Sequence, residues 1–72
     1  MSNITTCISS PPDRNFLVVE FFVDLEQWAE LNQEDGKLTL EIYPARSGNP
    51  WVFDFDEMIS LLEKSKNDLI GE

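Results

Sequence analysis

The sequence predicts an α+β domain, in which a small antiparallel sheet of three to four strands carries a C-terminal helix on one face. Two strand patterns support this prediction: an almost wholly apolar run over residues 16–23 and strict alternation over residues 37–43. The third observation is an amphipathic segment from residue 54 onward that opens with a capping signal. A chain of 72 residues has room for one hydrophobic core, so we expect a single domain over residues 15–72.

Residues 1–14 are rich in Ser, Thr and Pro and end soon after the Pro11-Pro12 pair, which favours an extended or turn conformation. We expect them to form a flexible N-terminal arm. The run that follows, residues 16–23 (FLVVEFFV), is β-branched and aromatic, with Glu20 as its one polar side chain. This composition is typical of a strand that is buried on both faces and therefore central in its sheet.

Residues 24–32 (DLEQWAELN) fit two structures. As a short helix, the segment would begin at an Asp24 N-cap and place its apolar residues on one face. As a strand, its alternate residues would face opposite sides, and a hairpin would follow across residues 33–36, which end in Asp-Gly. The abundance of Ala, Leu, Glu and Gln slightly favours the helix.

Residues 37–43 (KLTLEIY) alternate cleanly, which predicts a strand with its Leu and Ile side chains inward and its Thr, Glu and Tyr side chains outward. Residues 44–50 contain Pro, Ser, Gly and Asn and predict a loop. We expect residues 51–53 to begin a further strand.

The C-terminal helix is predicted to begin after Asp54, an N-cap with Glu57 at the capping-box spacing, and to end near Gly71. Acidic residues in its first turn and lysines in later turns agree with the helix dipole. The apolar residues that the helical spacing places on one face are Phe55, Met58, Ile59, Leu62 and Leu69.

The residue types present exclude most kinds of catalysis. No histidine is present, so the usual general acid–base and metal ligand is missing. The lone Cys7 forms neither an internal disulfide nor a zinc site, and a chain without disulfides favours a reducing compartment. Asp54, Asp56 and Glu57 could hold a hard cation such as Mg²⁺, but helix capping accounts for them. We therefore expect no enzymatic activity, no cofactor and no metal site.

Between Asn15 and Gly36 the chain has six carboxylates and no Lys or Arg, in a protein with a net charge of −9. The acids could simply form a solvated face that keeps the protein soluble. Solubility, however, does not require them to be concentrated in one stretch of the sequence. A surface dominated by one sign of charge selects partners of the opposite sign. Aromatic residues are enriched at interface hot spots. The predicted partner-binding residues are Glu20, Asp24, Glu26, Trp28, Glu30, Glu34, Asp35 and Tyr43.

These properties predict a small acidic protein-binding inhibitor of the immunity, antitoxin or phage anti-defence type. It would occlude the basic, nucleic-acid-binding surface of a target such as a nuclease, with carboxylates imitating phosphates. At this charge we expect no direct binding to nucleic acid or to an anionic membrane. The N-terminus has no signal-peptide pattern, so we expect a cytoplasmic location. The alternative is a non-catalytic structural or accessory domain that forms a homodimer or docks on a larger assembly.

Overall fold

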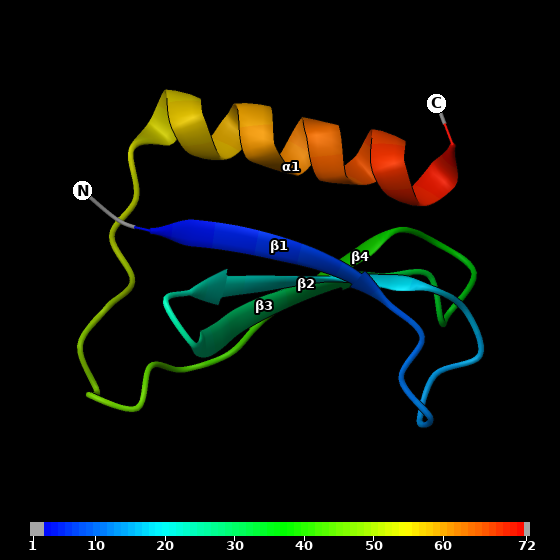
Figure 1. Cartoon of the computed structure of the whole chain (residues 1–72), viewed down its shortest axis with the longest axis horizontal. Helices are drawn as coiled ribbons and strands as arrows, with labels where there is room; N and C mark the ends of the chain where they lie inside the picture. Colours follow the sequence, from blue (N-terminus) through cyan, green and yellow to red (C-terminus); the bar gives the residue numbers. More distant parts are fainter. Residues whose placement is uncertain (1–2, 72) are drawn as a thin grey trace.

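The computed structural model describes residues 3–71, which form a four-stranded sheet and one helix lying over one face of it (Figure 1). The elements are β1 (Ile4–Ser9), β2 (Val18–Val23), β3 (Glu26–Asn32), β4 (Thr39–Ile42) and α1 (Phe55–Ile70). The strands meander in the order β1-β2-β3-β4, and every neighbouring pair is antiparallel. The predicted α+β fold, with the helix on one face of the sheet, is confirmed.

Strand β1 lies within the segment predicted as a flexible arm, and over residues 4–9 the structure differs from that prediction. The sequence of β1, ITTCIS, is mostly β-branched, and the strand pairs with β2 along its whole length. A central strand needs a hydrogen-bonding neighbour on each side, because its buried N–H and C=O groups must be paired. The Pro11-Pro12 pair instead belongs to the connection between β1 and β2.

Strand β2 has the predicted central position, between β1 and β3. It begins at Val18 rather than at Phe16, and the side chains of Phe16 and Leu17 are exposed in the preceding connection. Val18 and Val19, which point to opposite faces of the sheet, are both fully buried. The prediction of burial on both faces therefore holds for the first part of the strand.

The short helix favoured over residues 24–32 does not form, and the alternative, a strand followed by a hairpin, is observed as β3. Strand pairing explains why a strand forms within residues 24–32. β3 forms hydrogen bonds with β2 on one side and with β4 on the other, and the small helix propensity of these residues does not outweigh those bonds. Asp24 makes the tight β2–β3 connection with a φ of 54°, a conformation that Asp adopts more readily than most residues. Gly36, with a φ of 85°, closes the turn between β3 and β4.

A β-bulge between β2 and β3 interrupts the regular alternation of β3. Phe21 pairs with Ala29 and Phe22 with Gln27, which leaves Trp28 as the extra residue. Trp28 and Ala29 are consequently both buried in the core. Regular alternation would have directed these two neighbours to opposite faces.

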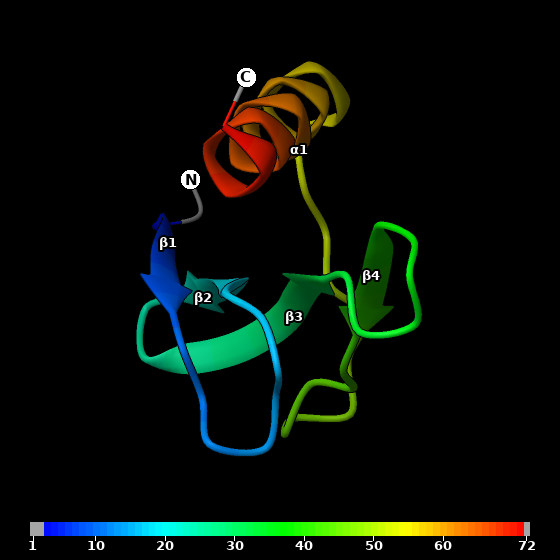
Figure 2. The same cartoon turned by 90° about the vertical axis from the view of Figure 1, so that its right-hand side faces the viewer.

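The core lies between the sheet and α1, and its buried residues are Val19, Phe21, Trp28, Ala29 and Leu31. The helix packs chiefly against β2. Its inward residues are Met58, Leu61, Leu62, Ser65 and Leu69. Seen along the helix axis, β4 lies to one side of α1, at the end of the sheet away from β1 (Figure 2). The helix therefore leaves the β4 side of this sheet face less covered.

Both predicted ends of α1 are confirmed. The Asp54 side chain caps the helix by accepting a hydrogen bond from Glu57 N at 2.9 Å, and Gly71 N donates to Asn67 O at 2.9 Å. Phe55 and Ile59 were predicted on the same face as the buried residues, yet both are exposed, because they lie on the flank of the helix toward β4. No helix in the described residues is long and apolar enough to cross a bilayer.

Residues 51–53 do not form the further strand that the sequence predicts. They are an extended linker that leads from the loop after β4 to α1. Trp51 Nε1 donates to Tyr43 O at 2.9 Å, and the Phe53 ring lies 4.6 Å from that of Trp28. The linker thus covers one end of the core by side-chain packing rather than by strand pairing.

Candidate functional site

The sheet face opposite α1 carries a row of glutamates from three adjacent strands. Glu20 of β2 pairs with Glu30 of β3, and Glu30 pairs with Glu41 of β4. Residues paired directly across antiparallel strands point to the same face and lie close together. Like charges in such positions destabilise a sheet unless a cation lies between them.

Arg14, in the connection between β1 and β2, supplies that cation. Its Nη2 lies 2.9 Å from Glu30 Oε2 and 2.8 Å from Glu41 Oε2. Asn32 Nδ2 donates to the same two carboxylates, at 3.0 Å and 2.6 Å. Glu30 is 6% exposed and Asn32 is 2% exposed, whereas the Glu41 side chain is 40% exposed, so the Glu30 side of the network is shielded from water and the Glu41 side is open to it. We call these four residues, Arg14, Glu30, Asn32 and Glu41, the polar cluster.

The polar cluster also affects the ionisation of its neighbours. Burial lowers the pKa of Arg14, but the Glu30 and Glu41 carboxylates outweigh burial and raise that pKa above its usual value. Burial, and then the same two carboxylates, raise the pKa of Tyr43 against the opposing effect of Arg14. At neutral pH, Arg14 is therefore charged and Tyr43 is neutral. The cluster holds the β1–β2 connection against the sheet, which is a structural role.

Two other predicted contact residues are engaged within the chain. Glu34 accepts hydrogen bonds from the backbone N–H groups of Asn15 and Phe16, at distances from 3.0 to 3.1 Å. Glu26 accepts one from Arg46 N at 2.7 Å. Both glutamates tie a loop to the sheet, so their carboxylates are partly satisfied before any partner arrives.

The remaining predicted residues differ in accessibility. Asp24 and Asp35 are exposed in turns at opposite ends of β3, and Glu20 and Tyr43 are half-buried. Trp28 is only 3% exposed and lies between the rings of Phe21 and Phe53, because the β-bulge turns it toward the core. The eight predicted residues therefore do not form one continuous surface, and Trp28 is not an exposed anchor.

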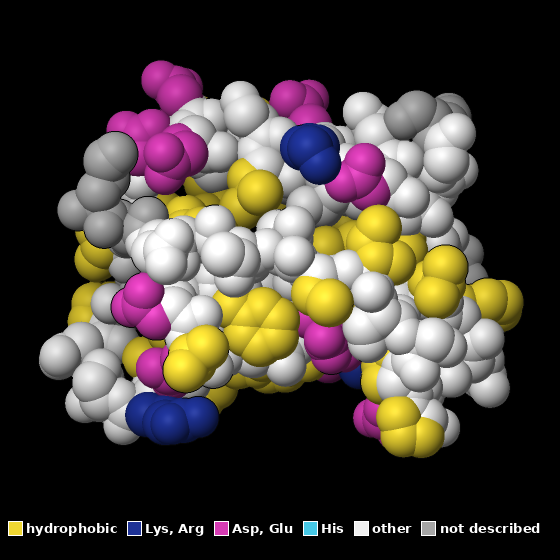
Figure 3. All heavy atoms as spheres, viewed as in Figure 1, with side chains coloured by type: hydrophobic (Ala, Val, Ile, Leu, Met, Phe, Trp, Pro, Cys, Tyr) yellow, Lys and Arg dark blue, Asp and Glu magenta, His cyan; other side chains and the backbone are white. Residues whose placement is uncertain are grey.

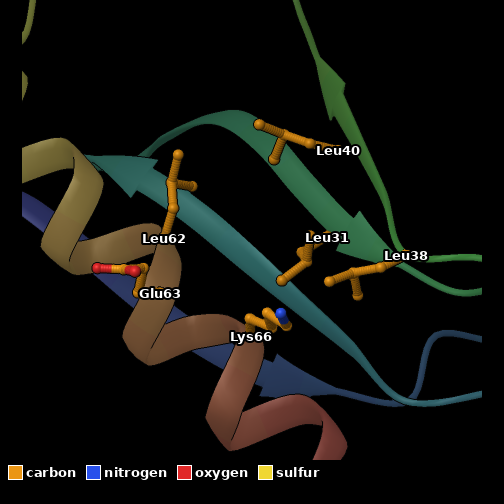
Figure 4. A pocket seen from close by; sticks show the side chains of 6 residues that line it. All are labelled: Leu31, Leu38, Leu40, Leu62, Glu63 and Lys66. Carbon is orange, nitrogen blue, oxygen red and sulfur yellow. The ribbon is translucent and has the colours of Figure 1, made fainter.

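An open apolar region lies on the other sheet face, between α1 and β4, and was not predicted as a site. One cavity of about 310 Å³ is lined by Leu31, Leu38, Leu40, Leu62, Glu63 and Lys66 (Figure 4). A second, of about 360 Å³, is lined by Trp28, Leu40, Ile42, Trp51, Phe53, Met58 and Leu62. The two cavities share Leu40 and Leu62 and so adjoin one another; we call the two together the α1–β4 groove.

Exposed apolar side chains extend the groove at its rim. Ile42 is 61% exposed on β4, and Phe55 and Ile59 are exposed on α1. The helical spacing places Phe55 and Ile59 on the flank that carries Leu62, a wall residue of both cavities. This stripe was visible in the sequence as part of the apolar helix face. Sequence reasoning missed the groove because the stripe does not show which apolar residues the sheet will cover.

The groove also has a polar feature inside it. Trp28 lines the deeper cavity, and its buried Nε1 has no hydrogen-bond partner in the described residues. A buried donor without a partner lowers stability by about 1–3 kcal/mol.

Negative charge is unevenly distributed over the molecule. Figure 3, which views the molecule from the β1 side, shows acidic side chains along the helix, gathered most densely at the N-terminal end of α1; β4 and the groove lie on the far side of this view. The acids of that end are Asp54 and the two first-turn residues Asp56 and Glu57, which directly follow the groove residue Phe53. Within residues 3–71, Glu30, Glu41 and Asp68 are the only carboxylates in ion pairs, so these three helix-start acids have no ionic partner there.

In the part of the chain that the structure describes, no group of three or more Cys, Asp or Glu side chains is arranged to hold a metal ion. Comparisons with protein-family models, curated proteins and solved structures find no significant match.

Proposed function

We propose that this chain is a small acidic protein-binding inhibitor that occludes a basic, nucleic-acid-binding surface of a target protein. The observation that carries the proposal is the α1–β4 groove, which consists of two adjoining apolar cavities with Glu63 in the lining and the acidic start of α1 following Phe53. Contiguous exposed apolar surface with a polar rim is typical of interaction sites. The acidic rim favours a basic partner and speeds its association.

The unpaired carboxylates supply the electrostatic part of the proposal. Asp24, Asp35, Asp56, Glu57 and Glu63 are exposed and form no ion pair within the described residues. Each lacks an ionic partner and is available to a Lys or Arg that otherwise contacts a nucleic-acid phosphate, although Asp24 also accepts from Asn3 Nδ2 at 3.5 Å and Asp35 from Thr39 Oγ1 at 3.1 Å. Of the predicted contact residues, Asp24 and Asp35 keep this role, whereas Glu30 belongs to the polar cluster.

The inhibitor would act by occlusion, without catalysis and without a cofactor, in the cytoplasm. Its net charge of −9 opposes direct contact with nucleic acid or with an anionic membrane. The partner would therefore be a basic protein, such as a nuclease.

A second candidate, a domain that self-associates, is favoured by the exposed apolar rim of the groove. Covering such a rim with a second copy would bury apolar surface in both chains. Repulsion between two chains of charge −9 opposes this arrangement, so we rank it second.

The test begins with capture of a partner by the tagged chain from cells of its source, with washes at low and then high salt. The recovered protein is purified, and its binding to nucleic acid is measured as the chain is added. We expect a salt-sensitive complex and a stoichiometric loss of nucleic-acid binding. Undiminished nucleic-acid binding by the captured partner would contradict the proposal, and a salt-stable homodimer in light scattering would favour the second candidate.

A matched pair of variants tests the role of the acidic rim. The variant Glu63→Gln removes an acid that lines the groove, whereas Asp13→Asn removes an exposed acid outside its lining. Both variants lose the same charge. We expect the first to weaken partner binding more than the second.

A further inference from the structure

We propose that the α1–β4 groove binds an extended, apolar and basic segment of the partner, which adds to the sheet as a new strand beside β4. The inference rests on the proposed function for the basic character of the partner. It adds the place and the mode of binding: main-chain pairing with an edge strand, together with side chains in an adjoining groove.

The first step is that β4 has a free backbone edge. In the described residues β4 pairs with β3 alone, so its other side ends the sheet. Tyr43 N donates to Trp28 O at 2.8 Å, which directs the backbone of Tyr43 toward β3. Backbone groups alternate in direction along an antiparallel strand. The N–H and C=O groups of Leu40 and Ile42 therefore point away from the sheet, toward any added strand.

The second step is that the same two residues form part of the groove. Leu40 lines both cavities and Ile42 lines the deeper one. A strand placed beside β4 directs every second side chain to the helix side of the sheet. Those side chains would enter the groove. One extended segment would therefore pair with the backbone edge of β4 and fill the α1–β4 groove at the same time.

The opposite edge of the sheet shows a contrasting surface. β1 also ends the sheet, but its exposed residues include Thr5, Thr6 and Cys7, with Ile8 as the one large apolar side chain among them. An apolar segment has little to contact there. Among the two edges, β4 is therefore the better docking position for an extended apolar segment.

The third step is the charge of the occupant. Glu63 lines the groove, and Asp56 follows Phe53 and Phe55 at one end of it, while Lys66 is the one basic residue in either lining. A segment with Lys or Arg near the Phe53 end matches this charge distribution. A second copy does not, because this chain has only five Lys and Arg in total and a net charge of −9. The occupant is therefore a basic segment of another protein.

The experiment uses a displayed library of short random peptides, selected on the full chain. We expect the enriched peptides to alternate apolar residues and to carry Lys or Arg. Amide hydrogen exchange then tests the geometry. Bound peptide should slow exchange at Leu40 and Ile42, whose N–H groups point outward, with little change at β1. Enrichment of acidic peptides, or protection elsewhere with none at Leu40 and Ile42, would overturn the inference, as would the absence of any enriched sequence.

A matched pair of substitutions tests the position of binding. Ile42 is 61% exposed on β4 and Ile8 is 51% exposed on β1, so Asp replaces a similar side chain at each edge. We expect Ile42→Asp to weaken peptide binding by about tenfold or more and Ile8→Asp to leave it unchanged. If Ile42→Asp fails to fold, Ile59→Asp on the helix rim provides the same test, since Ile59 is also exposed. Equal effects at the two edges would contradict docking at β4.

Different experimental outcomes would contradict this inference and the proposed function. If the captured partner loses nucleic-acid binding but Ile42→Asp inhibits it as well as the native chain does, the inhibitor acts through another surface. If peptides bind at β4 but the partner does not bind nucleic acid, the docking mode holds and the inhibitor function is wrong.

Discussion

The polar cluster and the α1–β4 groove occupy the two faces of the same two strands, and they differ in what they leave unsatisfied. Glu41 belongs to the cluster, whereas its neighbours Leu40 and Ile42 line the groove. In the cluster, Arg14 and Asn32 satisfy two glutamates within the chain, and among the described residues only the buried Arg14 Nε is left there without a partner. In the groove, apolar side chains and a buried indole N–H remain without partners in the described residues.

The difference has a physical cause. A buried carboxylate without a partner is very costly, so a fold that buries Glu30 must also bring a cation to it. Exposed apolar surface costs far less, because much of any protein surface is apolar, and it gains free energy when a partner covers it. The acids that are most prominent in the sequence are thus not the best guide to the binding surface. The groups that stay unsatisfied after folding are the better guide.

The largest expected effect comes from breaking the polar cluster. Arg14→Met should lower the free energy of unfolding more than a substitution at the helix cap or at the groove rim, because it leaves two glutamates together without their cation. Urea denaturation measures the loss. The control is Lys64→Met, which breaks the exposed Lys64–Asp68 pair and should cost about 0.5 kcal/mol or less. Equal losses of stability in the two variants would mean that Arg14 does not stabilise the fold by holding the β1–β2 connection against the sheet.

The wall of the groove depends on the start of α1. Asp54→Ala removes the cap that accepts from Glu57 N and should lower the free energy of unfolding by about 1 kcal/mol. Thermal denaturation provides the measurement. Asp54→Asn keeps an acceptor at the same position and should lose less. Similar losses for Ala and Asn would show that the hydrogen bond does not stabilise the helix.

A substitution at the groove rim should reduce partner binding but not stability, whereas a substitution in the polar cluster should reduce stability. Ile42→Asp should change the free energy of unfolding by no more than about 0.5 kcal/mol, because the side chain is exposed, while partner binding falls. Denaturation and binding measured on the same preparation separate the two effects. A large loss of stability would instead indicate that Ile42 belongs to the core.

The smallest expected effect is a pH dependence above the neutral range. Burial and two carboxylates raise the pKa of Tyr43 in the folded state, so the unfolded chain loses this proton first as pH rises. The stability contribution is complete below the usual tyrosine pKa and is lost above it. The free energy of unfolding should therefore fall more steeply above about pH 10 in the native protein than in Tyr43→Phe. Parallel pH profiles would contradict a raised pKa.

Local patterns predicted those parts of the fold that depend on neighbouring residues. The capping box at Asp54 and the glycine at position 71 predicted both ends of α1, and the alternation over residues 37–43 predicted which side chains of β4 share a face. The same alternation predicted Ile42 as inward, yet its side chain is 61% exposed because α1 does not cover it. The Asp-Gly pair predicted the turn before β4. Each of these signals spans a few residues, so no distant contact is needed to interpret it.

Pairing and packing between distant segments account for the rest. Residues 4–9 form β1 because the backbone N–H and C=O groups on that side of β2 require hydrogen-bond partners. Residues 24–32 contain a strand rather than a helix because β2 and β4 form hydrogen bonds with it on its two sides. The bulge that buries Trp28 depends on the β2 register, and Arg14 meets Glu41 across 27 positions of sequence. The groove exists because α1 packs chiefly on β2 and leaves β4 open. Composition, net charge, the helix and the turns thus follow from local sequence. Which charges are neutralised and which apolar residues stay open follow from long-range contacts, because both depend on which segments meet.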